Sequence, residues 1–281
     1  MIRKAGPADH EALAAFLAGY IESSMFLLGN LDAYGTDNTD HPHGTTFFLQ
    51  ETGDGIIGVF GATNGGLLMC QIPRLTALEA QTYAHLLRGY TLRGMTGASD
   101  QVALILDALP LGGAVWQINH DEPLCALDLA KLDTPEAVLR APEGNDQDTL
   151  AHWFNAYMTE TRTHPGGDAG RHRAKNALGS DRVRLLVEGG QITAMTGLNS
   201  FARDVVQIGG VYVPPELRGQ GRAGRVVAAH LAELKARGYA RAILFANSDH
   251  AARAYARIGF AHIGSYRVAL LQEPVTLGTP A

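Results

Sequence analysis

Long hydrophobic runs are missing from this sequence of 281 residues. No stretch of about eighteen consecutive apolar residues occurs, which excludes a typical membrane-spanning helix. The first residues, MIRKAGPADHEAL, also lack the apolar segment of a secretory signal peptide. We therefore expect a cytoplasmic protein with no membrane partner.

Cysteine is also scarce, and positive charge is scarce in the first half of the chain. Cys70 and Cys125 each stand among apolar neighbours, which predicts two buried free thiols and no disulfide. The net charge is −5, and residues 1–136 hold 6 Lys and Arg against 16 Asp and Glu, whereas residues 137–281 hold 17 against 12. A phosphate-bearing ligand would be drawn to the second part, but its positive charge is too scattered to predict a nucleic-acid partner.

Fixed metal-ligand spacing is absent too. Asp37, Asp40, His41 and His43 lie close together in TDNTDHPHG. The stretch is rich in Gly, Pro and Asn and shows neither helical nor strand spacing. We expect a solvated loop there and no metal site.

An internal repeat is present. IRKAGPADHEALAAFLAGY (2–20) aligns without gaps on LRAPEGNDQDTLAHWFNAY (139–157), at a shift of 137 residues. The shift matches Arg3 with Arg140, Asp9 with Asp146, Tyr20 with Tyr157 and Glu51 with Glu188. Each copy reads as a short strand, an amphipathic helix and a β-hairpin. We predict a duplication with one domain at 1–134 and another at 135–281, each of normal domain size.

The second copy continues with alternating elements. The pattern predicts strands at 205–213, 240–246 and 265–271, and helices at 222–237 and 250–258. This order indicates an α/β architecture.

A glycine run, Gly219-x-Gly221-x-x-Gly224, spells the dinucleotide fingerprint. The fingerprint requires a strand that ends at the first glycine and an acidic residue about twenty residues later. Here PPELR separates strand and glycine, and YARAILFA (239–246) holds no acid. A nucleotide-dependent oxidoreductase is therefore disfavoured.

The same residues fit a different anion site. Arg218-x-x-Gly221-x-Ala223 follows a strand and leads into a long helix. The backbone N–H groups of such a turn point at an anion, and glycine lets the backbone approach it closely. With Arg222 and Arg225 at its edge, the turn suits a pyrophosphate. The first copy has no equivalent segment.

GGVYVPPELRGQGRAGRVVAAHL, followed by AILFANSDHAARAYARIGF, resembles the acyl-CoA-binding core of the GNAT superfamily of N-acetyltransferases. The direct resemblance covers about residues 138–271, and the repeat extends it weakly to the first half. It implies two tandem GNAT-like domains of α/β class, each a mixed, mostly antiparallel sheet flanked by helices. The first domain would be a degenerate copy without the CoA motif.

The resemblance also implies the chemistry. Acetyl-CoA would be the co-substrate, with its pyrophosphate on the turn amides and its pantetheine along Gly210–Val213. Tyr255 would protonate the departing thiolate. The cofactor-binding residues implied in this way are Val211, Tyr212, Val213, Arg218, Gly219, Gln220, Gly221, Arg222, Ala223, Gly224, Asn247, Ser248 and Arg253.

Three positions depart from the family pattern. Gln207 stands where many members have a Glu as general base, and an amide cannot take a proton. Glu160, an ordered water or an amine that arrives neutral would serve instead. Ser248 occupies the usual place of a pantetheine-binding Asn, with Asn247 beside it. Gly224 lies in the first turn of the helix, at a modest cost in helix propensity. Where the family usually builds its acceptor pocket, this chain has the loop 163–172.

These observations predict an enzyme that transfers acetyl from acetyl-CoA directly to an amine of a small molecule or peptide. The alternative is a non-catalytic acyl-CoA-binding or sensing protein, which the missing Glu at 207 favours. A homodimer remains open.

Overall fold

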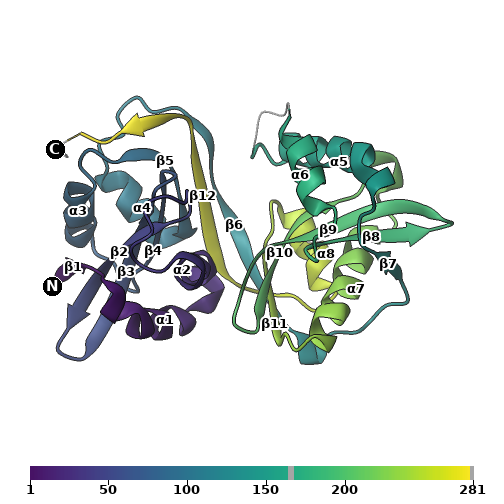
Figure 1. Ribbon diagram of the computed structural model, residues 1–281, viewed down its shortest axis with the longest axis horizontal. Coiled ribbons are helices and arrows are strands. Elements are labelled where there is room, and N and C mark those ends of the chain that lie inside the picture. The colour runs from purple at the N-terminus through teal and green to yellow at the C-terminus, as the bar shows by residue number, and fades with distance from the viewer. Residues whose placement is uncertain (164–167, 279–281) are drawn as a thin grey trace. The chain divides into compact units, whose positions relative to one another are not determined.

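The computed structural model describes residues 1–163 and 168–278 (Figure 1). The chain forms two compact units: unit 1 comprises Met1–Glu122 and Ser265–Ala281, and unit 2 comprises Pro123–Gly264. Among the described residues, no helix has the length and apolar character needed to cross a membrane.

Unit 1 is built on strands in the order β1-β2-β3-β4-β5-β12. Their bounds are Ile2–Lys4, Thr45–Thr52, Gly55–Thr63, Leu67–Gln71, Thr91–Ala98 and, for β12, Ala261–Thr276. Neighbouring strands are antiparallel except β4 and β5, which are parallel. The last strand of the chain thus completes the unit that holds the first, and Figure 1 shows β12 in yellow beside β5.

The helices of unit 1 cover these strands. They are α1 (His10–Ala18), α2 (Ile21–Tyr34), α3 (Ala77–Leu86) and α4 (Ser99–Ala108). Helix α3 begins with a capping box in which Thr76 accepts from the Glu79 amide. It packs into a core where the rings of Tyr83 and Phe60 stack with centroids 4.8 Å apart. Helices α1 and α2 pack on β3 and β4.

Unit 2 orders its strands β6-β11-β10-β9-β8-β7. The bounds are Trp116–Asp128 for β6, Val138–Arg140 for β7, Val183–Glu188 for β8, Gln191–Ala202 for β9, Val205–Tyr212 for β10 and Arg241–Phe245 for β11. Strands β10 and β11 are parallel, and the other described pairs are antiparallel. The fold is therefore mixed α/β with mostly antiparallel strands, as predicted.

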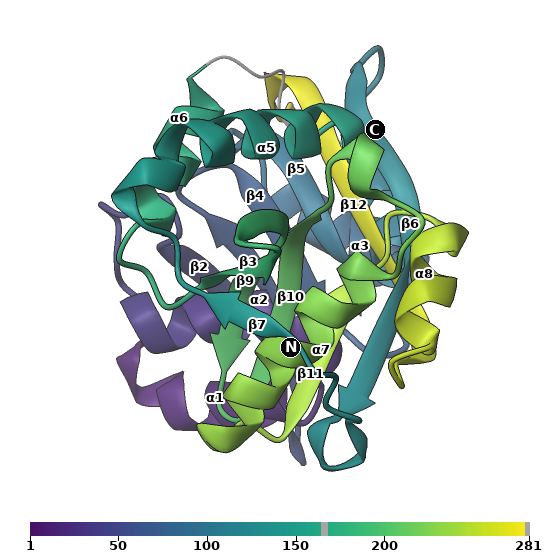
Figure 2. The ribbon, with the colours of Figure 1, turned by 90° about the vertical axis from the view of Figure 1, so that its right-hand side faces the viewer.

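Two helical layers enclose the strands of unit 2. Helices α5 (Gln147–Glu160) and α6 (Ala169–Ala177) pack on one face, and α7 (Arg222–Ala236) and α8 (Asp249–Ala256) belong to the core of the other (Figure 2). Helix α7 buries Val227, Leu231 and Leu234, which recur at helical spacing on one side. Short 3-10 turns lie at Pro7–Asp9, Leu129–Lys131, Gly144–Asp146 and Pro215–Leu217.

The repeat corresponds to equivalent elements. Each unit has a three-residue strand, a 3-10 turn, two helices and an antiparallel hairpin, from β1 to β3 in unit 1 and from β7 to β9 in unit 2. The two matched Arg–Asp pairs close this motif: Arg3 binds Asp9 and Arg140 binds Asp146, in both cases through two guanidinium nitrogens. Cys70 and Cys125 are buried and free.

The two compact units do not correspond to one boundary along the chain, because unit 1 contains two separate segments. Strand β6 begins in unit 1 and ends in unit 2, whereas β12 begins in unit 2 and ends in unit 1. The boundary at 134 concerns the two copies of the repeat, and it stays a prediction.

Candidate functional site

Strand β10 leaves its parallel neighbour before it ends. The pairing with β11 runs from Val205 with Arg241 to Ile208 with Leu244, whereas β10 continues to Tyr212. Its register with β9 shifts twice over the same residues. A Cβ on Gly209 would lie 2.1 Å from Nδ2 of Asn199, so a larger residue at this irregularity would require the Asn199 side chain to move. The end of β10 therefore extends past its parallel pairing.

Strand β11 is paired with β6 along its whole length. Phe245 pairs with Leu124 of β6, and the Ala246 amide donates to the Pro123 carbonyl over 3.0 Å. The two parallel strands thus part after Ile208 and Leu244.

A glycine turn follows β10 and begins α7. Gly219 and Gly221 have φ values of 78° and 72°, in the left-handed region that residues with a Cβ rarely adopt. Gly221 is the residue before the first turn of α7, whose leading N–H groups lack partners within the helix. Such N–H groups, aligned with the helix dipole, bind anions. The residues present therefore fit a diphosphate.

Gly224 does not meet the same demand. It lies inside α7, and a Cβ there would touch Cγ2 of Ile258 at 3.4 Å, an ordinary contact. In a dinucleotide fold the third glycine is needed for close packing of helix on strand. The geometry thus supports the prediction that the fingerprint is coincidental.

Arg218 lies at the start of the turn, next to Gly219. Its Nε donates to the Val213 carbonyl over 2.8 Å, and its NH2 donates to both Glu160 carboxylate oxygens over 2.8 and 3.0 Å. The guanidinium also lies 5.6 Å from the centre of the Tyr212 ring. The structure thus brings Glu160, the predicted base, to the turn, and pairs its carboxylate with an arginine.

Glu188, at the end of β8, binds the two other arginines of the turn. Its Oε2 accepts from Arg222 Nε over 2.5 Å, and its Oε1 lies 2.6 Å from Arg225 NH2. The hydrogen bond from Arg222 and the charge of Arg225 hold the pKa of the Glu188 carboxyl below its usual value. Sequence reasoning did not assign Glu188 to the site, although the repeat had matched it with Glu51.

Tyr255 lies on α8, half-buried in the core that α7 shares. Its ring meets Phe260 edge-on, with centroids 6.0 Å apart. Burial, and then the neighbouring Tyr157, raise the pKa of the Tyr255 phenol well above its usual value. The phenol is protonated at neutral pH, as it would also be at its ordinary pKa of about 10.

The other predicted cofactor residues lie at the end of β10, on the turn and the start of α7, and on or just before α8. Ser248 caps α8, where its Oγ accepts from the Ala251 amide over 3.2 Å and donates to Asn247 Oδ1 over 3.3 Å. Arg253 and Gln220 are exposed, Val211 and Ala223 are half-buried, and Tyr212 and Val213 are buried.

Two further predictions concern the acceptor side. Gln207 is 2 % exposed, and within the described residues its Oε1 has no hydrogen-bond partner. Of the loop 163–172 expected to shape the acceptor pocket, residues 164–167 lie outside the described residues. Its last four residues are not a loop, because Ala169–His172 form the first turn of α6. No cluster of metal-ligating side chains occurs in the parts of the chain that the structure describes.

Comparison with known proteins gives a family for part of the chain. Residues 148–260 match the model of the acetyltransferase (GNAT) family, a span that includes the turn and Tyr255. This segment of the chain is a GNAT domain. A search of the curated proteins finds no match.

Solved structures share the fold along nearly the whole chain. A GCN5-related N-acetyltransferase from Sphaerobacter thermophilus has 18 % identity and a TM-score of 0.56, over 100 % of this chain and 97 % of that one. A GNAT-family acetyltransferase from Colwellia psychrerythraea has 14 % and 0.55, over 97 % and 100 %. A tandem GNAT protein from the clavulanic acid biosynthesis pathway has 14 % and 0.54, over 98 % and 99 %. At such identities the likeness concerns the fold alone.

Proposed function

We propose that unit 2 is an N-acetyltransferase, which transfers acetyl from acetyl-CoA to an amine of a small molecule or peptide. The observation that carries the proposal is the Gly219–Gly221 turn at the start of α7, beside the point where β10 and β11 part. Tyr255 packs into the same core as α7. The match of residues 148–260 to an acetyltransferase family supports the assignment.

The turn and the strand end have separate tasks. Amides of Gly219–Gly224 bind the diphosphate, and Gly210–Val213 pairs with the pantetheine arm. An N–H on this strand end polarises the thioester carbonyl, which stabilises the charge that develops on its oxygen. Fixed backbone dipoles suit this task because they need no rearrangement during the reaction.

The transfer itself needs two proton movements. The amine nitrogen forms a bond to the carbonyl carbon, the carbon–sulfur bond breaks, and the electron pair leaves on sulfur. Tyr255 gives its phenolic proton to the thiolate. The amine loses a proton, which Gln207 cannot accept.

Glu160 is the proposed acceptor of that proton, with an ordered water or a neutral amine as alternatives. Its carboxylate is paired with Arg218, which also lies at the phosphate turn. A phosphate that draws Arg218 toward itself would leave Glu160 open to the substrate. Glu160→Gln should then lower kcat with the amine; an unchanged kcat would assign the step to water or to a neutral amine.

Unit 1 is proposed to be a degenerate copy. Its parallel strands β4 and β5 end at Gln71 and Ala98. Just beyond them, Oε1 of Gln101 accepts a hydrogen bond from the Ile72 amide over 2.7 Å. This buried bond joins the residue after β4 to α4, which follows β5. The link from β4 to α3, IPRLT, has no glycine. We expect one molecule of acetyl-CoA per chain in calorimetric titration, and two would contradict the degenerate assignment.

A non-catalytic acyl-CoA sensor is the second candidate, and Gln207 at the usual base position favours it. The full chain should be tested with acetyl-CoA and a panel of amines, with free CoA thiol as the readout. Turnover with any amine supports the enzyme, and binding without turnover supports the sensor. A thermal shift with NAD but none with acetyl-CoA would overturn both. A cytoplasmic location and a homodimer stay predictions.

A further inference from the structure

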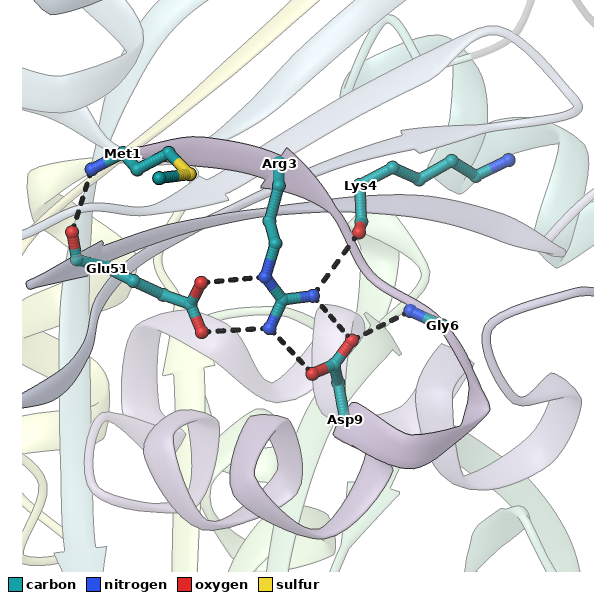
Figure 3. A network of polar contacts seen from close by, with 6 residues as sticks. All are labelled: Met1, Arg3, Lys4, Gly6, Asp9 and Glu51. Carbon is teal, nitrogen blue, oxygen red and sulfur yellow. Dashed lines mark hydrogen bonds and ion pairs between the residues drawn. The ribbon is translucent and has the colours of Figure 1, made fainter.

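The two copies of the repeat use one carboxylate in different ways. In unit 1, Glu51 accepts from Arg3 Nε over 2.7 Å and from Arg3 NH2 over 2.9 Å, while Asp9 accepts from the other side of the same guanidinium (Figure 3). The amino group of Met1 also donates to the Glu51 carbonyl over 2.8 Å. Glu51 therefore closes a network within its own motif.

In unit 2 the matching arginine and aspartate keep their bond, but the glutamate has changed partners. The described hydrogen bonds of Arg140 go to Asp146 and to the Ala141 carbonyl. Glu188 instead binds Arg222 and Arg225 of α7. The change of partner accompanies the glycine–arginine turn, which unit 1 lacks.

Arg222 is held on two sides. Its Nε donates to Glu188, and its NH1 donates to the Leu217 carbonyl over 2.8 Å. Its side chain is 13 % exposed, whereas that of Arg225 is 39 % exposed. Arg222 thus ties the residue before the turn to the first residue after it, and Arg225 stays at the surface, where a phosphate can reach it.

We propose that Glu188 is a positioning residue of the cofactor site, which fixes Arg222 across the turn and Arg225 beside its mouth before the diphosphate of acetyl-CoA arrives. Without this carboxylate, the mostly buried guanidinium of Arg222 would lose its counter-charge. Arg222 would then no longer be held against the Leu217 carbonyl, the contact that joins the two ends of the turn. A site already in its binding conformation does not spend binding free energy on ordering. This inference rests on the proposed function of unit 2.

The test compares Glu188→Gln and Glu188→Ala with Glu51→Gln, the matched change in unit 1. Each full-length variant is titrated with acetyl-CoA and with inorganic pyrophosphate, and kcat and KM are measured with the best amine from the panel. We expect Glu188→Ala to raise Kd for both ligands and KM for acetyl-CoA about tenfold, the effect of one lost charged hydrogen bond. We expect kcat at saturating acetyl-CoA to remain, since Glu188 does not touch the reacting atoms.

Glu51→Gln should lower thermal stability and leave both Kd values as in the wild type. Glu188→Gln keeps the shape of the side chain, so it should fold even where Glu188→Ala does not, and it should raise Kd by a smaller factor. On an Arg225→Ala background, Glu188→Gln should have a reduced effect, because part of its action passes through Arg225.

The outcomes separate the two proposals. Unchanged or lower Kd values in Glu188→Gln, with normal binding by the wild type, overturn the positioning role and leave the proposed function intact. A fall in kcat at saturation with Kd unchanged also overturns it. A wild-type chain that binds pyrophosphate but not acetyl-CoA overturns the proposed function, and the effect of Glu188→Gln on pyrophosphate then still decides the inference on the turn.

Discussion

His230 is the most unusual buried side chain of unit 2. It lies fully buried on α7, and neither ring nitrogen has a hydrogen-bond partner within the described part of the chain. Burial, and then the charges of Arg184 and Arg237, lower its pKa to about 3. The folded protein therefore keeps this imidazole neutral, whereas the unfolded chain protonates it at an ordinary pKa of about 6.5.

This difference predicts a stability that depends on pH. As the pH falls below about 6.5 toward 3, the unfolded state takes up a proton that the folded state refuses, so His230 lowers stability by up to about 1.4 kcal/mol per pH unit. His230→Leu should remove this loss, and it should be no less stable than the wild type at pH 7, because it removes two unpaired polar atoms. Urea unfolding at pH 7, 6 and 5 measures the effect.

His152, which is exposed on α5, provides the control. The same substitution at His152 controls for the general effect of replacing a histidine of unit 2 by leucine. A His230→Leu variant that loses as much stability in acid as the wild type would refute the assignment.

The phenol of Tyr255 gives a second prediction at this scale. If it protonates the thiolate, Tyr255→Phe should lower kcat by about 100-fold or more, the contribution of a general acid, with little change in Kd for acetyl-CoA. Tyr239 packs on the same core and is the matched control, so Tyr239→Phe should keep kcat. Equal rates in the two variants would assign the proton to another donor.

At the scale of the element, the start of α7 separates two glycines that look alike in the sequence. Gly221 has φ of 72°, so Gly221→Ala should cost on the order of 1 kcal/mol in strain and weaken acetyl-CoA binding. Gly224 lies in the helix with room for a Cβ, so Gly224→Ala should raise stability by roughly 0.5–1 kcal/mol.

Thermal melts with and without acetyl-CoA test the pair. The expected result is a lower melting temperature and a smaller ligand shift for Gly221→Ala, with a higher melting temperature and an intact ligand shift for Gly224→Ala. Loss of binding in Gly224→Ala would show that this glycine is needed for the backbone to approach the ligand.

The same elements show what the sequence could predict. Strand β10, helix α7 and strand β11 lie within one or two residues of the predicted ranges, because their apolar spacing, and Gly238 at the end of α7, depend on local structure. The left-handed turn was predictable for the same reason, since it demands glycine. The contact of Glu188 with Arg222 was not, because it depends on how the β8–β9 hairpin packs beside α7, which no local pattern records.

On the scale of the whole molecule, sequence patterns did not predict that β12, which follows unit 2 in the chain, completes unit 1. The pattern indicated a strand at 265–271, but a strand's own alternation does not name its partner. The structure pairs β12 with β5 from Tyr266 with Ala98 to Thr276 with Thr91. Leu271 and Leu277 complete the core of unit 1, far along the chain from its other members.

Deleting residues 265–281 should therefore affect unit 1. Without β12, the N–H and C=O groups of one edge of β5 lose their partners, and the core loses Leu271. We expect the amides of Thr91–Ala98 to exchange with solvent many times faster, while those of the β8–β9 hairpin in unit 2 keep their protection. Hydrogen exchange read by mass spectrometry resolves the two segments, and equal loss of protection in both would show that the units do not unfold separately.

Because β12 completes unit 1 but follows unit 2 in the chain, it also sets the order in which the two units can be completed during synthesis. Residues 265–276 leave the ribosome after every residue of unit 2, so unit 2 holds its full set of strands while unit 1 still waits for one. During that interval the nascent chain presents an unpaired edge at β5. Chaperones bind such surfaces, and aggregation can begin at them. Slow translation of the codons for residues 265–276 would prolong that exposure, although the encoded protein is unchanged.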